Sequence, residues 1–270
     1  VPAGGRVEAE EGTMNVQKGV EELVDLAPGD AGTLFFGTKR LLRQANHWYP
    51  SGNPRKHLAA EFLGSVLLHF IGATCVINSL DLTLNGTKHA HHLSQTGLLI
   101  SALGNGFATA TLMYCFGGEN GSGGKLNPAI STGLFVAKRL RTLTFASEMA
   151  VQFIGAAIGG LLVRCVVPES HLEALEGEAA TFEVVGLLSG KSAWRLFIWE
   201  ALSTASVVFV YFATAVDRHN LVYTKNMFPL AVGLAVTAGT LSCGPFVGVC
   251  MNPARAMAAA IAYWDISGLW

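Results

Sequence analysis

Residues 122–136 read SGGKLNPAISTGLFV, and residues 244–263 read GPFVGVCMNPARAMAAAIAY. Both stretches contain the triplet Asn-Pro-Ala. The two triplets are Asn127, Pro128 and Ala129, and Asn252, Pro253 and Ala254. The apolar segments that they open, 127–137 and 252–263, are too short to cross a bilayer, which needs about 20 apolar residues. We therefore predict two half-helices that enter the membrane without spanning it.

The triplet itself predicts a helix start. Asparagine is among the best N-cap residues, because its side-chain oxygen accepts a backbone N–H of the first turn. Proline suits the first helical position, where its missing N–H would have no partner anyway. The NH2 group of each asparagine then stays free to donate across a narrow lumen. The positive ends of both half-helix dipoles would point at the same place and repel cations, including hydronium.

The composition agrees with a membrane protein. Of the 270 residues, 51% are hydrophobic and 14% are charged, whereas soluble domains carry about 25% charged residues. The net charge of −1 offers no electrostatic footprint for a nucleic acid. Five segments are long enough, or nearly so, to span a bilayer. They are approximately 57–80, 97–117, 142–166, 193–215 and 226–243. The predicted fold class is all-α.

The two halves of the chain repeat one pattern, approximately 57–166 and 193–270. Each half has a glutamate early in an apolar span, Glu61 or Glu200, and an Asn-Pro-Ala triplet later. Three spans per repeat would place the second repeat upside down relative to the first. We expect both carboxylates to accept N–H groups from the loops before the half-helices, with proton relay as the alternative. Glu148 has no counterpart, and we expect it near the membrane surface.

Two regions of unequal size are expected, an N-terminal tail at 1–50 and a channel domain at 51–270. Lysine and arginine gather before the first span and before the third. By the positive-inside rule the N-terminus is predicted to be cytoplasmic, and loops 81–96 and 167–192 face outward. Asn85 in the first of these loops begins an Asn-Gly-Thr tripeptide, a possible glycan acceptor. The plasma membrane and an internal membrane both remain open as locations.

Together these features resemble the aquaporin (major intrinsic protein) family. Residues 122–129, SGGKLNPA, are similar to the family's first motif, which normally reads S-G-G-H-x-N-P-A. Residues 244–255 resemble its second motif, including the arginine after the triplet, Arg255. The resemblance implies a water channel, a homotetramer and no cofactor. The family has a sixth span, which is expected to begin where this chain stops, at Trp270.

The resemblance also implies a constriction near the outer mouth. Its four positions fall on Asn105, Thr240, Val249 and Arg255, with Phe107 as the alternative to Asn105. Strict water channels of the family usually place an aromatic residue and a histidine at the first two positions. The smaller side chains here predict passage of further solutes, with hydrogen peroxide, ammonia, urea and small polyols as candidates. Ala256 follows the arginine where glycerol facilitators usually carry aspartate.

Three functions remain in competition: a channel dominated by water, a solute facilitator with incidental water flux, and an adhesive or structural membrane scaffold with a closed pore. An enzyme is not expected, because no nucleophile–base pair, metal-ligand spacing or phosphate loop stands out. His69 lies in the first span, where an apolar residue is usual. We expect a neutral histidine bonded to a neighbouring helix rather than a pH gate.

Overall fold

The computed structural model describes residues 53–79, 95–117, 121–169, 193–217, 226–247 and 250–263, and no strand occurs among them. The elements are α3 (Pro54–Ser79), α4 (Gln95–Phe116), α5 (Pro128–Val136), α6 (Thr142–Val166), α9 (Ala193–Tyr211), the π-helical turn η1 (Phe212–Val216), α11 (Phe228–Val247) and α12 (Pro253–Tyr263). The predicted all-α fold is confirmed. Val249 and Asn85, predicted for the constriction and the glycan, lie outside the described residues, as does the tail 1–50.

Helix lengths follow the apolar segments of the sequence. Among the described residues, four helices are long and apolar enough to cross a membrane. They are Pro54–Ser79, Thr96–Phe116, Thr142–Val166 and Phe197–Val216. The fifth predicted span is α11, which contains the shorter apolar stretch Phe228–Gly244. The two predicted half-helices are α5 and α12, with 9 and 11 residues.

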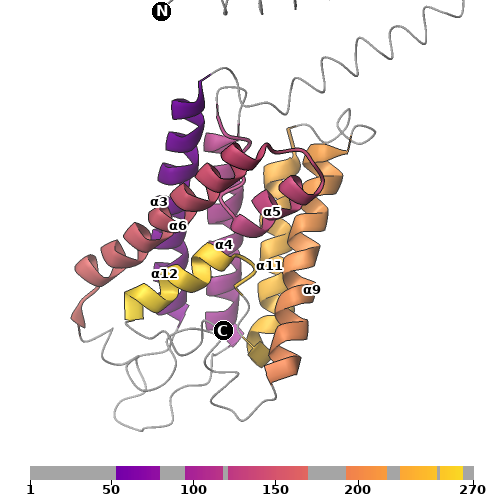
Figure 1. The fold of residues 1–270 in the computed structure, drawn as a ribbon. Helices are drawn as coiled ribbons and strands as arrows, with labels where there is room; N and C mark the ends of the chain where they lie inside the picture. The colour runs from indigo at the N-terminus through magenta and orange to yellow at the C-terminus, as the bar shows by residue number, and fades with distance from the viewer. Residues whose placement is uncertain are drawn as a thin grey trace, which may run out of the picture. The chain divides into compact units, whose positions relative to one another are not determined.

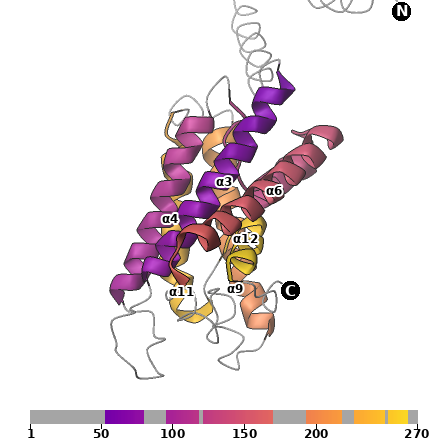
Figure 2. The same cartoon turned by 90° about the vertical axis from the view of Figure 1, so that its left-hand side faces the viewer.

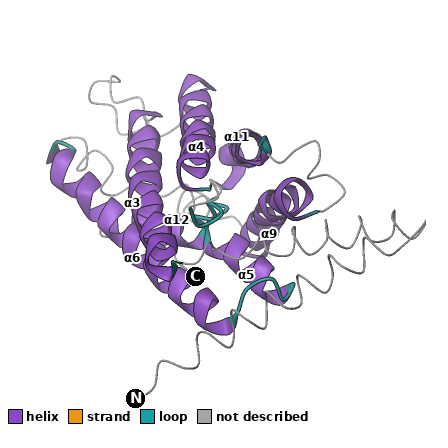
Figure 3. Ribbon diagram, turned by 90° about the horizontal axis from the view of Figure 1, so that it is seen from above, coloured by secondary structure: helices purple, strands orange, loops and turns teal. Residues whose placement is uncertain are grey.

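The helices form a closed ring. Seen from above, α3, α4, α11, α9, α5 and α6 follow one another around it, and each neighbouring pair is in contact (Figure 3). The half-helix α12 packs against α6 and also contacts α3 and α5 (Figure 2). Both half-helices begin at mid-height of the bundle and run away from each other (Figure 1). Their N-termini therefore meet in the interior of the ring.

Glycines allow the close helix contacts that close this ring. A Cβ atom at Gly159 of α6 would lie 2.7 Å from the backbone oxygen of Val66 in α3. A Cβ atom at Gly160 would lie 2.3 Å from the backbone oxygen of Ala258 in α12. Both distances are far below van der Waals contact, so any larger residue would force the helices apart. The position of α12 against α6 therefore depends on a residue without a side chain.

Apolar and polar side chains are distributed inside-out relative to a soluble protein. Large apolar side chains point outward, among them Leu143 at 80% exposure and Phe197 at 74%. Charged and amide side chains lie inside, where Glu61, Glu148 and Gln152 have no exposed surface. An outward apolar surface of this kind is stable against lipid, and buried polar groups in membrane helices mark functional positions.

Candidate functional site

Each Asn-Pro-Ala triplet opens a half-helix, and its asparagine caps that helix. The Asn127 Oδ1 atom accepts the backbone N–H of Ala129 at 2.9 Å, at the N-terminus of α5. The Asn252 Oδ1 atom accepts the backbone N–H of Ala254 at 3.0 Å, at the N-terminus of α12. Pro128 stands at the first position of α5, where no N–H partner is needed. Each asparagine thus satisfies one of the unpaired N–H groups at the start of its half-helix.

The two asparagines also bind each other's loop. The Asn127 Nδ2 atom donates to the backbone oxygen of Met251 at 2.9 Å. The Asn252 Nδ2 atom donates to the backbone oxygen of Leu126 at 3.0 Å. We expected both NH2 groups to be free, but one hydrogen of each is used in this exchange. The second hydrogen of each amide is left to donate elsewhere.

The residue before each asparagine adopts the left-handed backbone conformation. Leu126 has a φ of 47° and Met251 has a φ of 55°. Residues other than glycine rarely adopt this conformation, and they do so where the surrounding structure holds them. The backbone carbonyl of this left-handed residue accepts the hydrogen bond from the side-chain NH2 group of the opposite asparagine. The two loops therefore share one backbone geometry as well as one triplet.

A carboxylate supports each loop, fully buried in Glu61 and partly buried in Glu200. Glu61 accepts the backbone N–H of Lys125 at 3.1 Å and that of Leu126 at 2.9 Å. Glu200 accepts the backbone N–H of Cys250 at 3.1 Å and that of Met251 at 2.7 Å. In each case the carboxylate binds consecutive amides of the non-helical segment before the half-helix. These amides have no helical partner, and the carboxylate supplies the acceptor they need.

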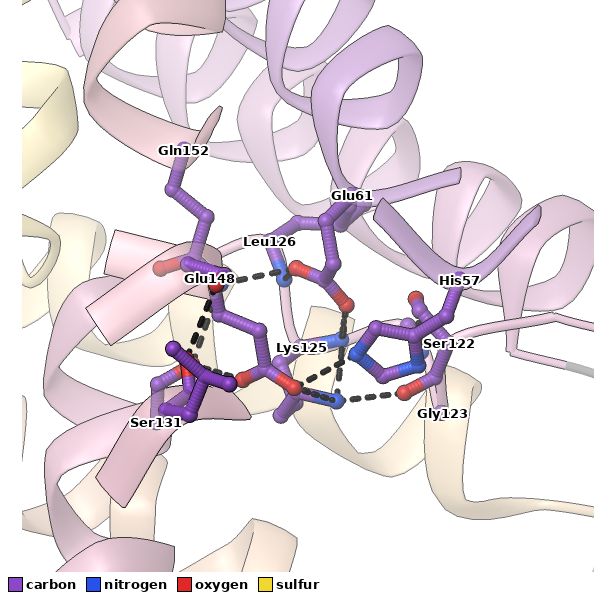
Figure 4. Close-up of polar contacts among 12 residues, drawn as sticks. His57, Glu61, Ser122, Gly123, Lys125, Leu126, Ser131, Glu148 and Gln152 are labelled. Carbon is purple, nitrogen blue, oxygen red and sulfur yellow. Dashed lines mark hydrogen bonds and ion pairs between the residues drawn. The ribbon is translucent and has the colours of Figure 1, made fainter. Parts of the chain in front are cut away.

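Glu148 is also buried, whereas we expected only a charge near the membrane surface without partners inside the protein. Its carboxylate has no exposed surface. One oxygen lies 2.6 Å from His57 Nε2, and the other accepts the hydroxyl of Ser131 at 3.1 Å (Figure 4). Gln152 donates to Ser131 at 3.0 Å and to Glu61 at 2.7 Å. The two glutamates of α3 and α6 thus belong to one hydrogen-bonded cluster behind the first loop.

Lys125 brings a positive charge into this cluster. Its Nζ atom lies 3.2 Å from Glu148 Oε1 and 3.6 Å from Glu61 Oε1, and it donates to the backbone oxygen of Ser122 (Figure 4). The lysine side chain is 4% exposed. A buried charge of this kind is tolerated only when paired and hydrogen-bonded. The two carboxylates of the cluster supply the pairing that the buried ammonium group of Lys125 needs.

Two glycines shape the start of the first loop. Gly123 has a φ of 87° and Gly124 has a φ of 61°, both in the left-handed region that favours glycine. A Cβ atom on Gly124 would lie 3.0 Å from the backbone oxygen of Met113. The hydroxyl of Tyr211 donates to the backbone oxygen of Gly123 at 3.0 Å. These contacts place the loop between α4 and α9.

A cavity runs past the paired asparagines. It leaves about 30 Å³ open to the centres of water-sized molecules. Its wall includes both asparagines and Arg255, together with Lys125 and Asn105. Apolar residues of α3, α4, α5, α9, α11 and the two loops form most of the remaining wall. A narrow passage with a few polar groups in an otherwise apolar wall suits small neutral molecules.

The predicted constriction is only partly assembled around this cavity. Asn105 and Arg255 line it, whereas Thr240 is not among the described lining residues. Thr240 is buried, and its hydroxyl donates to the backbone oxygen of Val236 in its own helix at 2.9 Å. The alternative Phe107 is 55% exposed on the outside of α4.

His69 lines the same cavity. Its Nδ1 atom lies 2.6 Å from the backbone oxygen of Ser65, one turn earlier in the same helix. We expected this histidine to bond a neighbouring helix, so that detail is wrong. A histidine nitrogen facing a carbonyl oxygen must carry the hydrogen, which leaves Nε2 as the acceptor.

Sequence analysis missed the cluster around Lys125. The available signals were the lysine at the histidine position of the first motif and the unmatched Glu148. Neither indicates a partner by itself, because the two residues are 23 positions apart and lie on different elements. His57 carried no signal at all, since it precedes the apolar part of the first span.

Comparisons with known proteins place the chain in a family. Residues 50–270 match the family model of the major intrinsic proteins. Aquaporin TIP2-2 of Zea mays is 32% identical over 217 residues, which is 80% of this chain and 79% of that protein. Aquaporin TIP2-1 of Arabidopsis thaliana is 31% identical over 213 residues, 78% of this chain and 77% of that protein. The crystal structure of the aquaglyceroporin from Plasmodium falciparum shares the fold, with a TM-score of 0.64 at 18% identity over 80% of this chain and 84% of that chain.

The family model matches most of the chain, and the aquaporin relatives are aligned over most of their length. Both findings agree with the ring of helices and its two half-helices. The chain belongs to the major intrinsic protein (aquaporin) family and is a multi-pass transmembrane channel, not an enzyme.

Proposed function

We propose that this channel passes water and small neutral solutes and excludes ions and protons at its paired asparagines and at Arg255. The reciprocal bonds between Asn127 and Asn252 and the opposite loops carry the proposal. The remaining N–H of each amide is available to a molecule in the lumen. A water that accepts from both asparagines must turn its own hydrogens away from its neighbours. That orientation interrupts a continuous proton wire.

Electrostatics supports the same conclusion. The half-helices α5 and α12 point their N-termini, the positive ends of their dipoles, at the asparagines. Arg255 adds a full positive charge to the wall of the same cavity. A cation entering this passage loses its water and meets only positive potential, whereas a neutral molecule meets no such barrier.

The second part of the proposal is a constriction wider than that of a strict water channel. Asn105, Thr240, Val249 and Arg255 are its proposed members. The outward exposure of Phe107 and the place of Asn105 in the cavity wall support Asn105. Hydrogen peroxide, ammonia and urea are the proposed solutes besides water. A solute facilitator with incidental water flux is the second candidate, favoured by the same small side chains.

We further propose that Glu61 and Glu200 serve as loop supports, that the chain forms a homotetramer, and that its N-terminus is cytoplasmic. The carboxylates each hold two consecutive loop amides, which supports the first point. Lys138, Arg139 and Arg141 between α5 and α6 support the orientation, since positive loops stay inside.

Reconstituted vesicles test the main proposal. Osmotic water permeability is measured by stopped-flow light scattering, with uptake of urea, ammonia and hydrogen peroxide in the same preparation. We expect water flux well above that of empty vesicles, solute uptake, and no increase in proton conductance. Background water flux from a folded protein would refute the channel proposal, and water flux alone would refute the wider constriction.

A matched pair of variants links the flux to the cavity. Val236 of α11 lines the passage, and Leu234 on the same helix is 53% exposed on the outside. We expect Val236→Trp to reduce all fluxes strongly, because the indole fills the lumen. Leu234→Trp makes the same addition on the outer face and should leave the fluxes unchanged. Equal effects of the two variants would show that the flux does not use this cavity.

A further inference from the structure

Lys125 stands where the first motif of the family carries histidine, and its surroundings explain how a lysine is accepted there. Its ammonium group faces two carboxylates, Glu148 Oε1 at 3.2 Å and Glu61 Oε1 at 3.6 Å. Both carboxylates have no exposed surface. The question is which of the two requires the lysine.

Glu61 has several hydrogen-bond donors in addition to the lysine. It accepts three N–H groups besides the ammonium, two from the loop backbone and one from Gln152 at 2.7 Å. Glu200 supports the second loop with two backbone N–H groups and a hydroxyl from Thr204 at 3.4 Å. No lysine or arginine forms an ion pair with Glu200 among the described residues. Glu200 is partly exposed, and the charge of Arg255 also acts on it, so the second half holds its carboxylate without a close ion pair.

Glu148 is in a different position. Apart from the ammonium, its partners are one ring nitrogen of His57 and one hydroxyl of Ser131. None of its described hydrogen bonds comes from a backbone amide of the loop. A carboxylate with so few donors is costly to bury unless a positive charge lies beside it. Glu148 is therefore the carboxylate that requires the charge of Lys125.

Lys125 lies nearer to the pore than the two carboxylates do. Lys125 lines the cavity beside Leu126 and Asn127, whereas Glu61 and Glu148 are not among the described lining residues. The lysine consequently lies between the lumen and two negative charges. Unscreened carboxylates next to a narrow pore attract cations, since charge rings of this sign select for them.

We propose that Lys125 is a positioning and charge-balancing residue that holds the first pore loop and shields the lumen from Glu148 and Glu61. This inference rests on the proposed ion-excluding channel. It predicts that removal of the lysine alone opens a cation leak and loosens the loop. It also predicts that removal of Glu148 together with the lysine cancels most of the defect, because Glu61 keeps its two loop amides and Gln152 as donors.

The test compares Lys125→Met, Glu148→Gln and the double variant in reconstituted vesicles. Water permeability, potassium and proton leak, and the melting temperature of the purified protein are measured for each. We expect Lys125→Met to raise the ratio of cation leak to water flux severalfold and to lower the melting temperature by about 10 °C, the scale for breaking a buried ion pair. The double variant should recover most of both losses. Lys138→Met, the same substitution at an exposed lysine, is the control.

Several results would overturn the inference. One is a Lys125→Met variant that leaks no more than the wild type, and another is a double variant that leaks as much as Lys125→Met. If Lys125→Met does not fold, folding of the double variant supports the pairing, and failure of both refutes it. The melting temperatures decide on the pairing even without flux, whereas background water flux in the wild type refutes the channel proposal itself.

Discussion

The first pore loop, residues 122–127, and the second, residues 250–252, hold their asparagines with the same backbone and with different side chains. In both loops a left-handed residue precedes the asparagine, and a glutamate of a long helix accepts two consecutive amides. Behind the first loop lies a cluster of two carboxylates, a lysine and a histidine. Behind the second loop, Glu200 accepts hydrogen bonds, and the charge of Arg255 acts on it without a close ion pair.

This difference separates what the repeat preserves from what it does not. The backbone geometry recurs, because each half-helix must start inside the membrane with its amides satisfied. The electrostatics differ, because Lys125 forms close ion pairs with the carboxylates behind the first loop, whereas Glu200 is partly exposed and has no close ion pair among the described residues. The ion pairs at the first loop can be removed experimentally without touching the shared geometry.

The largest effects are expected from removing the supporting carboxylates. Glu200→Leu leaves the amides of Cys250 and Met251 without an acceptor, at about 1–3 kcal/mol for each. Glu61→Leu removes the acceptor of two amides in the same way, and it also removes one of the two carboxylates that pair with Lys125. We therefore expect Glu61→Leu to lower the free energy of unfolding more than Glu200→Leu does. Denaturation of both variants in detergent measures this difference, and equal losses would show that the charges of the first loop contribute nothing.

Next come the asparagines, which should behave alike. Asn127→Ala and Asn252→Ala each lose a helix cap, worth about 1 kcal/mol, and one bond to the opposite loop, worth about 1 kcal/mol. Both variants should also conduct protons better than the wild type, because one donor in the lumen is gone. A pH-sensitive dye inside vesicles measures the proton flux. A defect in only one of the two variants would contradict the symmetric role.

The two half-helices pack against their neighbours differently, and we expect glycine substitutions there to lower the free energy of unfolding by different amounts. A Cβ at Gly160 would lie 2.3 Å from a backbone oxygen of α12, whereas a Cβ at Gly133 of α5 would meet side chains of α9 and η1 at 3.1 Å. Backbone cannot yield as a side chain can. Gly160→Ala should therefore lower the free energy of unfolding by about 1–3 kcal/mol, and Gly133→Ala by less. Thermal unfolding of both variants tests this order, which a larger loss at Gly133 would reverse.

The smallest effects are expected at two hydroxyl groups. Tyr211→Phe removes the bond to the backbone oxygen of Gly123, an interaction worth about 1 kcal/mol. Thr204→Val removes a longer contact to Glu200, 3.4 Å, and should cost less. Melting temperatures of the two variants provide the measurement. A larger loss at Thr204 would mean that the carboxylate of the second loop relies on its hydroxyl donor rather than on backbone amides.

Much of the fold was predictable from apolar length. The predicted segment 142–166 coincides with α6, and 193–215 ends one residue before η1 does. The Asn-Pro-Ala triplets placed the starts of α5 and α12 correctly, because capping and proline geometry are local properties. The family assignment followed from those triplets and Arg255, whose spacing is also written along the chain.

The interior contacts were not predictable in the same way. The exchange between Asn127 and Met251 joins residues 124 positions apart, and the contact between His57 and Glu148 joins residues 91 positions apart. No local pattern specifies such pairs. An isolated glutamate in an apolar span signals an unusual burial but not its partner.

The sequence by itself determined which segments are helical, which two are too short to span, and where both short helices begin, since propensity, capping and apolar length act over a few residues. Only the tertiary structure decided that the two asparagines exchange hydrogen bonds with the opposite loops and that Glu148 lies inside beside a lysine. The physical reason is that burial and pairing of polar groups depend on which helices pack together, and packing is a property of the whole ring.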